Sequence, residues 1–243
     1  MINKTLLITG GTRGIGRAVA MRLARDGHRL AVSYRNDARA AEETAAELSR
    51  LGVDNRIYQA DLSDPVQAGA LPGRVFADFG GLDGLVNNAG MTDDAAFLAL
   101  ESERYQRVLN TNLFGTMRLT SAALPYLLKS RNASIVILSS LGGIAGKEGQ
   151  VAYATSKGAL IGFTQWLGRK YGPLGISVNA VAPGFIQTDM VSGLKHKMFD
   201  HIIEGTALQR MGEADEVADA VAFLLSPGYI HATTLRVDGG FNR

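Results

Sequence analysis

The sequence predicts an α/β fold in which helices cover both faces of a doubly wound parallel sheet of about seven strands. Short apolar runs rich in β-branched residues alternate with amphipathic stretches along the chain, which is the order of repeated βαβ units. Most of these runs lack the alternation of a strand with one exposed face. We therefore expect strands that are buried on both sides, as in a parallel sheet.

Each strand of this sheet corresponds to one apolar run. The expected strands are 5–9, 29–34, 56–60, 84–88, 134–139, 176–182 and 234–238. Amphipathic helices are expected between them, among others over 14–26, 37–51 and 101–129. No repeat or linker breaks this pattern, so we expect one domain over residues 1–243, with a small helical lid at 185–212.

Composition excludes several classes of function. The chain is 46% hydrophobic and 20% charged, with a net charge of +2 and no cysteine. We therefore expect neither nucleic acid nor a membrane as a partner. The lack of cysteine excludes disulfides and thiolate metal sites and fits a cytoplasmic location. The four histidines lack a metal-binding spacing, so no metal is expected. The N-terminal apolar run is interpreted as a first strand, not a signal peptide.

A glycine-rich loop, TGGTRGIG at residues 9–16, joins the first strand to the first helix. Gly10, Gly14 and Gly16 allow a sharp turn, close approach of a phosphate, and tight packing of the helix. The N–H groups at the helix N-terminus would then face a pyrophosphate. The loop predicts a Rossmann-type dinucleotide site. A glycine-rich turn without a ligand is the alternative, because the spacing differs from G-x-G-x-x-G.

The end of the second strand indicates which dinucleotide binds. An NAD site would have an acidic residue there, whereas this chain has Tyr34 followed by Arg35. Arg13 lies in the glycine loop. Two guanidinium groups near the adenosine ribose favour a 2′-phosphate, which arginine binds through paired hydrogen bonds. The predicted cofactor is NADP(H), and Asp37 keeps NAD possible.

Tyr153 and Lys157 form a second candidate site. Their spacing places both side chains on one face of a helix. An ammonium group near a phenol favours the phenolate and lowers the phenol pKa from about 10. Such a phenol can donate a proton to a carbonyl oxygen. Taken alone, such a pair is more often a partly exposed helix face.

Together with NNAG (87–90) and VDGG (237–240), these motifs make the chain resemble the short-chain dehydrogenase/reductase family from residue 4 onward. The family binds a nicotinamide dinucleotide and has an Asn-Ser-Tyr-Lys tetrad. The resemblance implies that the catalytic residues are Asn112, Ser140, Tyr153 and Lys157. Asn110 and Ser139 are the competing choices for the first two. Asn112 would hold a water that leads from Lys157 to solvent.

The resemblance also implies a set of cofactor contacts. The glycine loop would contribute Gly10, Thr12, Arg13, Gly14, Ile15 and Gly16. The adenosine half would contact Tyr34, Arg35, Asp61, Leu62, Asn88, Ala89 and Gly90. The nicotinamide half would contact Tyr153, Lys157, Pro183, Gly184, Ile186 and Thr188.

Within the family, the chain is most similar to 3-oxoacyl-[acyl-carrier-protein] reductases. This similarity implies an NADPH-dependent ketoreductase that reduces a 3-oxoacyl thioester, on acyl carrier protein or coenzyme A, to the 3-hydroxyacyl form. One alternative is a dehydrogenase of another secondary alcohol, a sugar or a cyclic ketone. Another is a catalytically silent NADP-binding sensor or scaffold.

Partners are also implied by the resemblance. Such reductases dock the carrier protein with basic residues near the site entrance, and Arg131 matches one such position, whereas Leu174 replaces a second. The family is mostly homotetrameric or dimeric through helices around 101–129 and 152–171. HATT (231–234) replaces the usual Thr-Gly-Gln turn. The lid residues Lys195, Lys197 and Arg210 could meet a phosphopantetheine phosphate or be solvated.

Two further acidic pairs, Glu42-Glu43 and Asp93-Asp94, are interpreted as solvated charges of a helix and a loop.

Overall fold

Seven parallel strands form the central sheet, in the order β3-β2-β1-β4-β5-β6-β9. The computed structural model describes residues 3–188, 196–226 and 228–241. The strands are β1 (Thr5–Thr9), β2 (Arg29–Tyr34), β3 (Asn55–Gln59), β4 (Gly84–Asn87), β5 (Ala133–Leu138), β6 (Ile176–Pro183) and β9 (Thr234–Val237). Every predicted strand is confirmed to within one residue at each end. The order reverses between β1 and β4, which is where doubly wound folds bind their ligands.

Burial explains why apolar and polar residues do not alternate along most strands. All residues of β1, β4 and β5 are buried. Their side chains point alternately to the two faces of the sheet, and helices cover both faces. One apolar cluster, which includes Leu7 and Leu85, lies on one face, and a second, which includes Ile8 and Val86, lies on the other.

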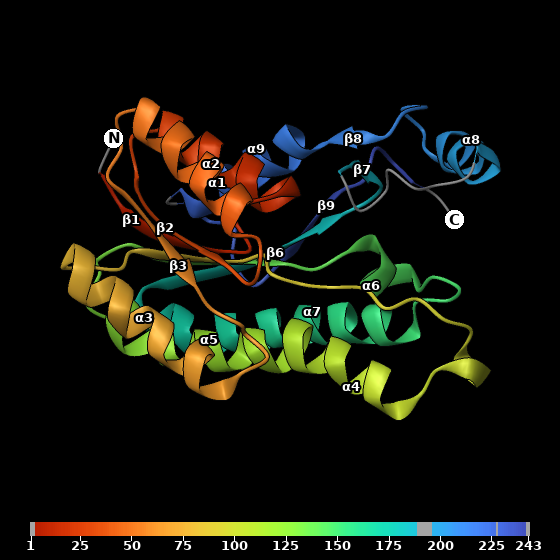
Figure 1. Ribbon diagram of the computed structural model, residues 1–243, viewed down its shortest axis with the longest axis horizontal. Helices are drawn as coiled ribbons and strands as arrows, with labels where there is room; N and C mark the ends of the chain where they lie inside the picture. Colours follow the sequence, from red (N-terminus) through yellow and green to blue (C-terminus); the bar gives the residue numbers. More distant parts are fainter. Residues whose placement is uncertain (1–2, 189–195, 227, 242–243) are drawn as a thin grey trace.

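Helices form a layer on each face of the sheet (Figure 1). One layer contains α1 (Gly14–Arg25), α2 (Ala38–Arg50) and α9 (Ala214–Leu225). The other contains α3 (Pro65–Phe79), α4 (Ser102–Leu109), α5 (Thr116–Leu127) and α7 (Val151–Tyr171). No helix among the described residues has the length and apolarity needed to cross a bilayer.

The prediction of a single α-helix over 101–129 is wrong in one respect. A π-helical segment, η2 (Asn110–Gly115), separates α4 from α5. Such segments insert an extra residue into a helix and often occur at functional sites. Here the wider turn carries Asn112, whose amide is hydrogen-bonded to the backbone of Met91 rather than exposed to solvent.

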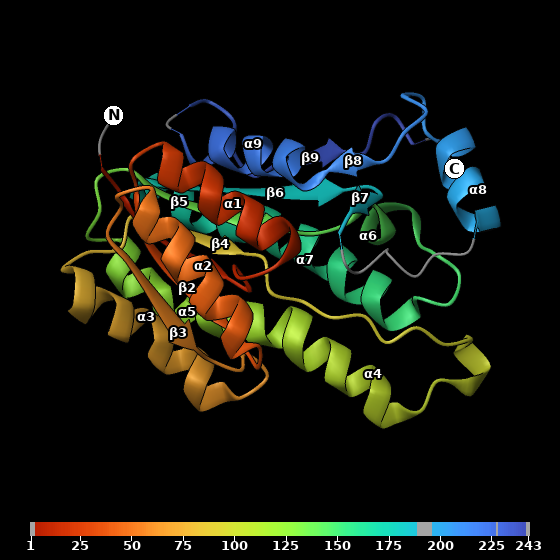
Figure 2. The same ribbon diagram turned by 45° about the horizontal axis from the view of Figure 1, so that its top comes forward.

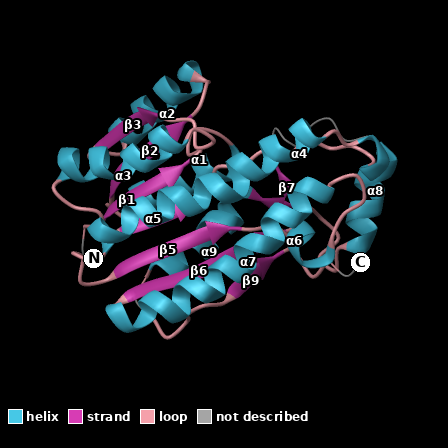
Figure 3. Cartoon of the chain, turned by 90° about the horizontal axis from the view of Figure 1, so that it is seen from below, coloured by secondary structure: helices cyan, strands magenta, loops and turns pink. Residues whose placement is uncertain are grey.

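The carboxyl ends of the strands carry the remaining elements. The strand arrows in Figure 3 point toward the end of the molecule where α4, α6 (Leu141–Ala145) and α8 (His196–Gly205) lie. Figure 2 shows α8 at the same end of the molecule as α6 and β7 (Ile186–Gln187), and β7 pairs with β8 (Gly212–Glu213). The predicted lid segment therefore contains a helix, and its residues 189–195 lie outside the described part of the chain.

Candidate active site

A cleft of about 1560 Å³ lies at the carboxyl ends of the strands and is larger than an ordinary small-ligand pocket of about 300–1,000 Å³. All predicted cofactor contacts line it: Gly10, Thr12, Arg13, Gly14, Ile15, Gly16, Tyr34, Arg35, Asp61, Leu62, Asn88, Ala89, Gly90, Tyr153, Lys157, Pro183, Gly184, Ile186 and Thr188. Ser140 lines the cleft as well, whereas Asn112 does not. One cavity therefore collects residues from widely separated parts of the chain.

The glycine loop forms one end of the cleft. Gly10 and Gly14 have positive φ angles of 60° and 49°, which favour glycine. A Cβ atom on Gly16 would lie 2.2 Å from the Gly10 carbonyl oxygen and 2.4 Å from Asn88 Nδ2. Asn88 Nδ2 donates to the carbonyl oxygens of Thr9 (2.9 Å) and Gly10 (3.0 Å). The loop is thus packed against the end of β4 with no space for a side chain at Gly16.

The first turn of α1 fits an anionic ligand. Arg13 occupies the N-cap without a capping side-chain hydrogen bond, and the first turn contains no acidic residue. The N–H groups at a helix N-terminus lack partners within the helix, and the helix dipole favours negative charge there. This end of the cleft therefore suits the pyrophosphate of a dinucleotide.

The two arginines near the predicted ribose site lie in different environments. Arg13 forms an ion pair with Asp37 at 3.6 Å, and the two side chains are 66% and 39% exposed. Asp37 also caps α2 by accepting from the backbone N–H of Ala40 at 3.0 Å. Such exposed pairs contribute at most about 1 kcal/mol, so a phosphate dianion can compete with Asp37 for Arg13. Arg35 is exposed at the same rim.

The adenine side of the cleft is built after β3. The Asp61 carboxylate accepts from the backbone N–H (2.9 Å) and hydroxyl (2.7 Å) of Ser63. Leu62 is buried and contributes apolar surface to the cleft. The local hydrogen bonds fix the orientation of Asp61 without any ligand.

The structure separates the two candidate serines. Ser139 is buried, and its hydroxyl donates to the backbone carbonyl of Lys157 at 2.8 Å. Ser140 lines the cleft and caps α6 by accepting from the N–H of Gly142 at 3.1 Å. Ser139 therefore holds α7 against β5, and Ser140 is the hydroxyl near Tyr153.

Tyr153 and Lys157 both reach the cleft from α7. Lys157 is 4% exposed. Its Nζ atom donates to the Leu138 carbonyl at 2.7 Å and lies 5.7 Å from the centroid of the Tyr153 ring. Burial lowers the pKa of Lys157 to about 8. Burial also raises the pKa of Tyr153, and a hydrogen bond with Ser140 opposes this effect. The predicted lowering of the Tyr153 pKa by Lys157 is therefore wrong: desolvation of the phenol is the largest cause, and the net shift is upward.

Asn112 lies behind the cleft. It is fully buried, with Oδ1 accepting from the Met91 N–H (2.8 Å) and Nδ2 donating to the Met91 carbonyl (2.9 Å) and Ser156 Oγ (3.1 Å). A Cβ atom on Gly90 would lie 3.3 Å from Asn112 Oδ1 and 3.5 Å from Lys157 Nζ. The Asn112 side chain thus holds the loop after β4, and its role in holding a water stays a prediction. The alternative residue Asn110 is half-buried and does not line the cleft.

The far end of the cleft contains apolar residues that sequence analysis missed. Met91, Phe185, Ile202 and Phe241 line it. The rings of Phe185 and Phe241 lie 5.2 Å apart, and Lys147 Nζ lies 5.2 Å from the Phe185 ring. Met91 directly follows the NNAG motif and could have been inferred from it. Ile202 and Phe241 come from α8 and the segment after β9, and no local pattern indicates their role.

The predicted lid cations are only partly within the described chain. Arg210 is bound to Glu216 through two hydrogen bonds of 2.8 and 2.6 Å. Glu216 also accepts from the backbone N–H of Glu213 in the capping box of α9. Arg210 is therefore exposed to solvent and at the same time paired with Glu216 of α9. Lys195 and the side chain of Lys197 lie outside the described residues.

Arg131 and Leu174 do not lie near the entrance of the cleft. Arg131 precedes β5 and Leu174 precedes β6, so both lie at the amino ends of their strands. Ser140 follows the carboxyl end of β5. The six residues of β5 separate the two ends by about 20 Å, at roughly 3.3 Å per residue. Arg131 therefore lies at the opposite end of β5 from Ser140, and docking of a carrier protein near it stays a prediction.

The described residues contain no cluster of three or more His, Cys, Asp or Glu side chains able to hold a metal ion.

Comparison with known proteins adds independent evidence. A family model described as enoyl-(acyl carrier protein) reductase matches residues 10–242. The chain is 38% identical to 3-oxoacyl-[acyl-carrier-protein] reductase FabG of Staphylococcus aureus, over 98% of both chains. It is 37% identical to the FabG enzyme of Escherichia coli, over 98% of this chain and 96% of the relative.

Solved structures show the same fold. A short-chain dehydrogenase of Burkholderia cenocepacia, solved in complex with NADP, matches with a TM-score of 0.93 and 39% identity, over 99% of this chain and 98% of that chain. A double mutant of a Serratia marcescens short-chain dehydrogenase/reductase matches with a TM-score of 0.93 and 32% identity, over 98% and 97% of the chains. With the glycine loop and the Ser140, Tyr153 and Lys157 side chains in one cleft, the chain belongs to the short-chain dehydrogenase/reductase family of oxidoreductases.

Proposed function

We propose that the protein is an NADPH-dependent ketoreductase that reduces a 3-oxoacyl thioester to its 3-hydroxyacyl form. The observation that carries this proposal is the placement of Ser140, Tyr153 and Lys157 in the same cleft as the glycine loop. The substrate class is supported by the names of the curated relatives, which are 3-oxoacyl-[acyl-carrier-protein] reductases. The cofactor is supported by the NADP bound in the Burkholderia relative.

The described residues fit NADP(H). The loop at Gly10, Gly14 and Gly16 and the first turn of α1 would hold the pyrophosphate, because they offer backbone N–H groups without obstructing side chains. Arg13 and Arg35 would hold the 2′-phosphate. The bound cofactor would supply the hydride for reduction.

Tyr153 would act as the proton donor. When hydride adds to the carbonyl carbon, the C=O electron pair moves to oxygen, which takes the proton from the Tyr153 hydroxyl. Ser140 would donate a hydrogen bond to the same oxygen and stabilise its developing charge. The raised pKa of Tyr153 keeps the phenol protonated at neutral pH, and this is the form that the reduction consumes.

Lys157 would stabilise the phenolate that remains on Tyr153. Its Nζ is anchored by the Leu138 carbonyl at 2.7 Å, so the ammonium group is held in one position before the reaction. With a pKa of about 8, the group is mainly charged at neutral pH. The ammonium group would also bind the nicotinamide ribose hydroxyls from its place in the lining of the cleft.

The enoyl reductase named by the family model would reduce a C=C bond instead. The two hydroxyl groups at Ser140 and Tyr153 favour a carbonyl, since both can donate to one oxygen. The curated relatives, at 37–38% identity over nearly the whole chain, also act on 3-oxoacyl groups by name. We therefore favour ketone reduction.

A substrate panel tests this proposal. NADPH oxidation is followed with acetoacetyl-coenzyme A, a 3-oxoacyl carrier protein, a 2-enoyl thioester, a sugar and a cyclic ketone, and then repeated with NADH. We expect turnover of the 3-oxoacyl thioesters with NADPH. Turnover restricted to the enoyl thioester, the sugar or the cyclic ketone would contradict the proposed substrate, and tight NADPH binding with no turnover at all would indicate a sensor.

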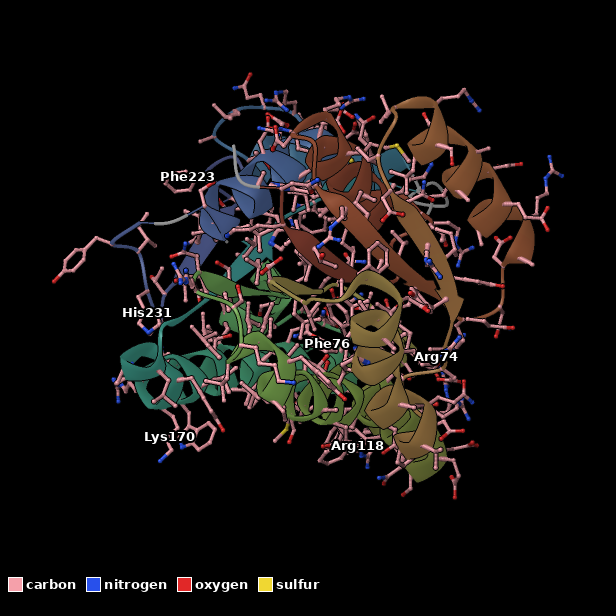
Figure 4. All side chains as sticks on the ribbon, turned by 90° about the vertical axis from the view of Figure 1, so that its left-hand side faces the viewer. Arg74, Phe76, Arg118, Lys170, Phe223 and His231 are labelled. Carbon is pink, nitrogen blue, oxygen red and sulfur yellow. The ribbon has the colours of Figure 1, made fainter. Side chains whose placement is uncertain are left out.

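Assembly as a homotetramer is part of the proposal. Phe114, Met117 and Trp166 are exposed apolar residues of η2, α5 and α7. Phe223 of α9 is 58% exposed and lies at the outside of the molecule in Figure 4. Such surfaces are typical of subunit contacts. Light scattering in solution tests this, and a monomeric mass would contradict it.

A further inference from the structure

The loop of residues 91–96, which links β4 to η1 (Phe97–Ala99), forms one wall of the far end of the cleft. We call it the substrate-side loop. Met91, Thr92, Asp94 and Ala96 all line the cleft. The sequence-based interpretation as a solvated charge is wrong for Asp93, whose side chain is 17% exposed and bound by α4, whereas Asp94 is exposed and also bonded to the start of α7.

Asp93 attaches the loop to α4. Arg104 donates from both Nε (2.9 Å) and Nη2 to Asp93 Oδ1, and Arg107 Nη2 donates to Oδ2 at 2.9 Å. Arg104 Nη2 also donates to the backbone carbonyl of Asp94 at 3.2 Å. The Asp93 side chain is 17% exposed, and hydrogen bonding by Arg104 lowers its pKa, so it is a carboxylate at neutral pH. The interaction of a half-buried carboxylate with two arginines is stronger than that of an isolated ion pair on the surface.

Asp94 attaches the same loop to the start of α7. Gln150 Nε2 donates to Asp94 Oδ2 at 2.7 Å, and the Ala95 N–H donates to the Gly149 carbonyl at 2.9 Å. Gln150 is the N-cap residue of α7 and lies three residues before Tyr153. Residues three apart share a helix face, and both of these side chains line the cleft. The loop therefore spans from α4 to the first turn of the helix that carries Tyr153.

We propose that Asp93, Asp94, Arg104 and Gln150 are positioning residues that fix the substrate-side loop and so determine how tightly the ketone substrate binds. None of the predicted cofactor contacts belongs to this loop, and the closest of them in sequence is Gly90. Loosening the loop is thus expected to weaken substrate binding while cofactor binding stays unchanged. This inference rests on the proposed function, since it assumes that a ketone occupies the cleft beside Tyr153.

A charge exchange tests the attachment to α4. Asp93→Arg and Arg104→Asp each place like charges together, and the double variant Asp93→Arg/Arg104→Asp restores an ion pair with the opposite polarity. We expect each single variant to raise KM for acetoacetyl-coenzyme A about tenfold, the size of one charged hydrogen bond lost. We expect the double variant to recover part of that loss, because the arginine introduced at position 93 still lies beside Arg107 and the bond from Arg104 to the Asp94 carbonyl is gone. The NADPH Kd, measured by fluorescence titration, should stay within about twofold throughout.

Arg107→Ala is the matched control, because the Arg107 side chain is 57% exposed and, among the described residues, donates one side-chain hydrogen bond, to Asp93 Oδ2. It should change KM by less than about threefold. Unchanged KM in both single variants, no recovery in the double variant, or an equal loss of NADPH affinity would each overturn the inference.

Asp94→Asn and Asp94→Ala test the attachment to α7. The amide oxygen of the Asn variant can still accept from Gln150, so its KM should stay near the wild-type value, whereas the Ala variant should raise KM about tenfold. Equal effects of the two would overturn this part. Hydrogen exchange of residues 91–100 in all variants provides a readout independent of substrate: faster exchange in the single variants alone supports the loop contacts even if the proposed ketone is the wrong substrate.

Discussion

Replacing Lys157 with Met should stabilise the fold while removing its activity. The lysine is buried, and burial lowers its pKa from 10.5 to about 8. This difference corresponds to about 3 kcal/mol of unfavourable desolvation of the ammonium group, at about 1.4 kcal/mol per pKa unit. Loss of the hydrogen bond to the Leu138 carbonyl offsets about 1 kcal/mol of the gain. We expect Lys157→Met to be more stable by about 2 kcal/mol at neutral pH.

The effect must also depend on pH in a defined direction. Below about pH 8 Lys157 is protonated in both the folded and the unfolded state, so the full desolvation cost of the ammonium group destabilises the fold. Between about pH 8 and 10.5 the folded state loses the proton and the unfolded state keeps it. The stability of the wild type therefore rises with pH in this window relative to the variant. This change amounts to about 3 kcal/mol over the window, so the variant's advantage of about 2 kcal/mol should vanish and become a deficit of about 1 kcal/mol near pH 10.5.

Urea unfolding of both proteins at about pH 7 and pH 10 measures this difference. Lys170→Met is the matched control, because Lys170 is exposed near the end of the same helix (Figure 4). Its stability should change by no more than about 0.5 kcal/mol. A Lys157→Met stability difference that is the same at both pH values, or a variant less stable than the wild type at neutral pH, would refute the account of Lys157 as a desolvated cation.

Three other predictions follow from the same structure. The rate of ketone reduction should fall as pH rises through about 8, because Lys157 then loses its charge, and a rate that is constant from pH 6 to 10 would contradict this. Gly16→Ala should weaken NADPH binding at least about tenfold in a fluorescence titration, since its Cβ would collide with the Gly10 carbonyl. The control Gly69→Ala, an open position in α3, should leave binding unchanged and stabilise the fold by about 0.5–1 kcal/mol. Ala232→Gly should raise stability by about 0.5–1 kcal/mol, because Ala232 has a φ of 53°; a decrease would contradict it.

Ala232 belongs to the HATT segment (231–234), and its neighbour His231 explains part of that sequence. His231 Nδ1 accepts from the Val178 N–H at 3.3 Å, and Nε2 lies 2.9 Å from the Gly168 carbonyl. Figure 4 shows His231 beside the end of α7. A Cβ atom on Gly172 would lie 2.6 Å from His231 Nε2. His231 thus fills the space between α7 and β6. The left-handed position of the turn is occupied by Ala232 instead of a glycine.

Sequence patterns were sufficient for the sheet but not for the helix that carries Asn112. The strands were predicted within one residue because burial on both faces leaves a continuous apolar run. The π-helical segment was missed because its cause lies elsewhere: the Asn112 amide binds the backbone of Met91, 21 residues away. The helical pattern of a short stretch of sequence does not predict a contact with a residue so far away.

The same limit applies to the site. Motif spacing identified Ser140, Tyr153 and Lys157, and the structure brings these into one cleft. The sequence does not reveal the contacts of Asp93 and Asp94, because their partners Arg104 and Gln150 are 11 and 56 residues away. Charged loop residues acquire a role only through such distant partners, which composition and periodicity do not record.

The central claim is that Tyr153 donates the proton to a ketone while NADPH is oxidised. Single-turnover NADPH oxidation with acetoacetyl-coenzyme A, in the wild type and in Tyr153→Phe, tests it most directly. The account predicts at least about a hundredfold loss of rate, in the range of a general acid, with an unchanged NADPH Kd. Full turnover by Tyr153→Phe would contradict it.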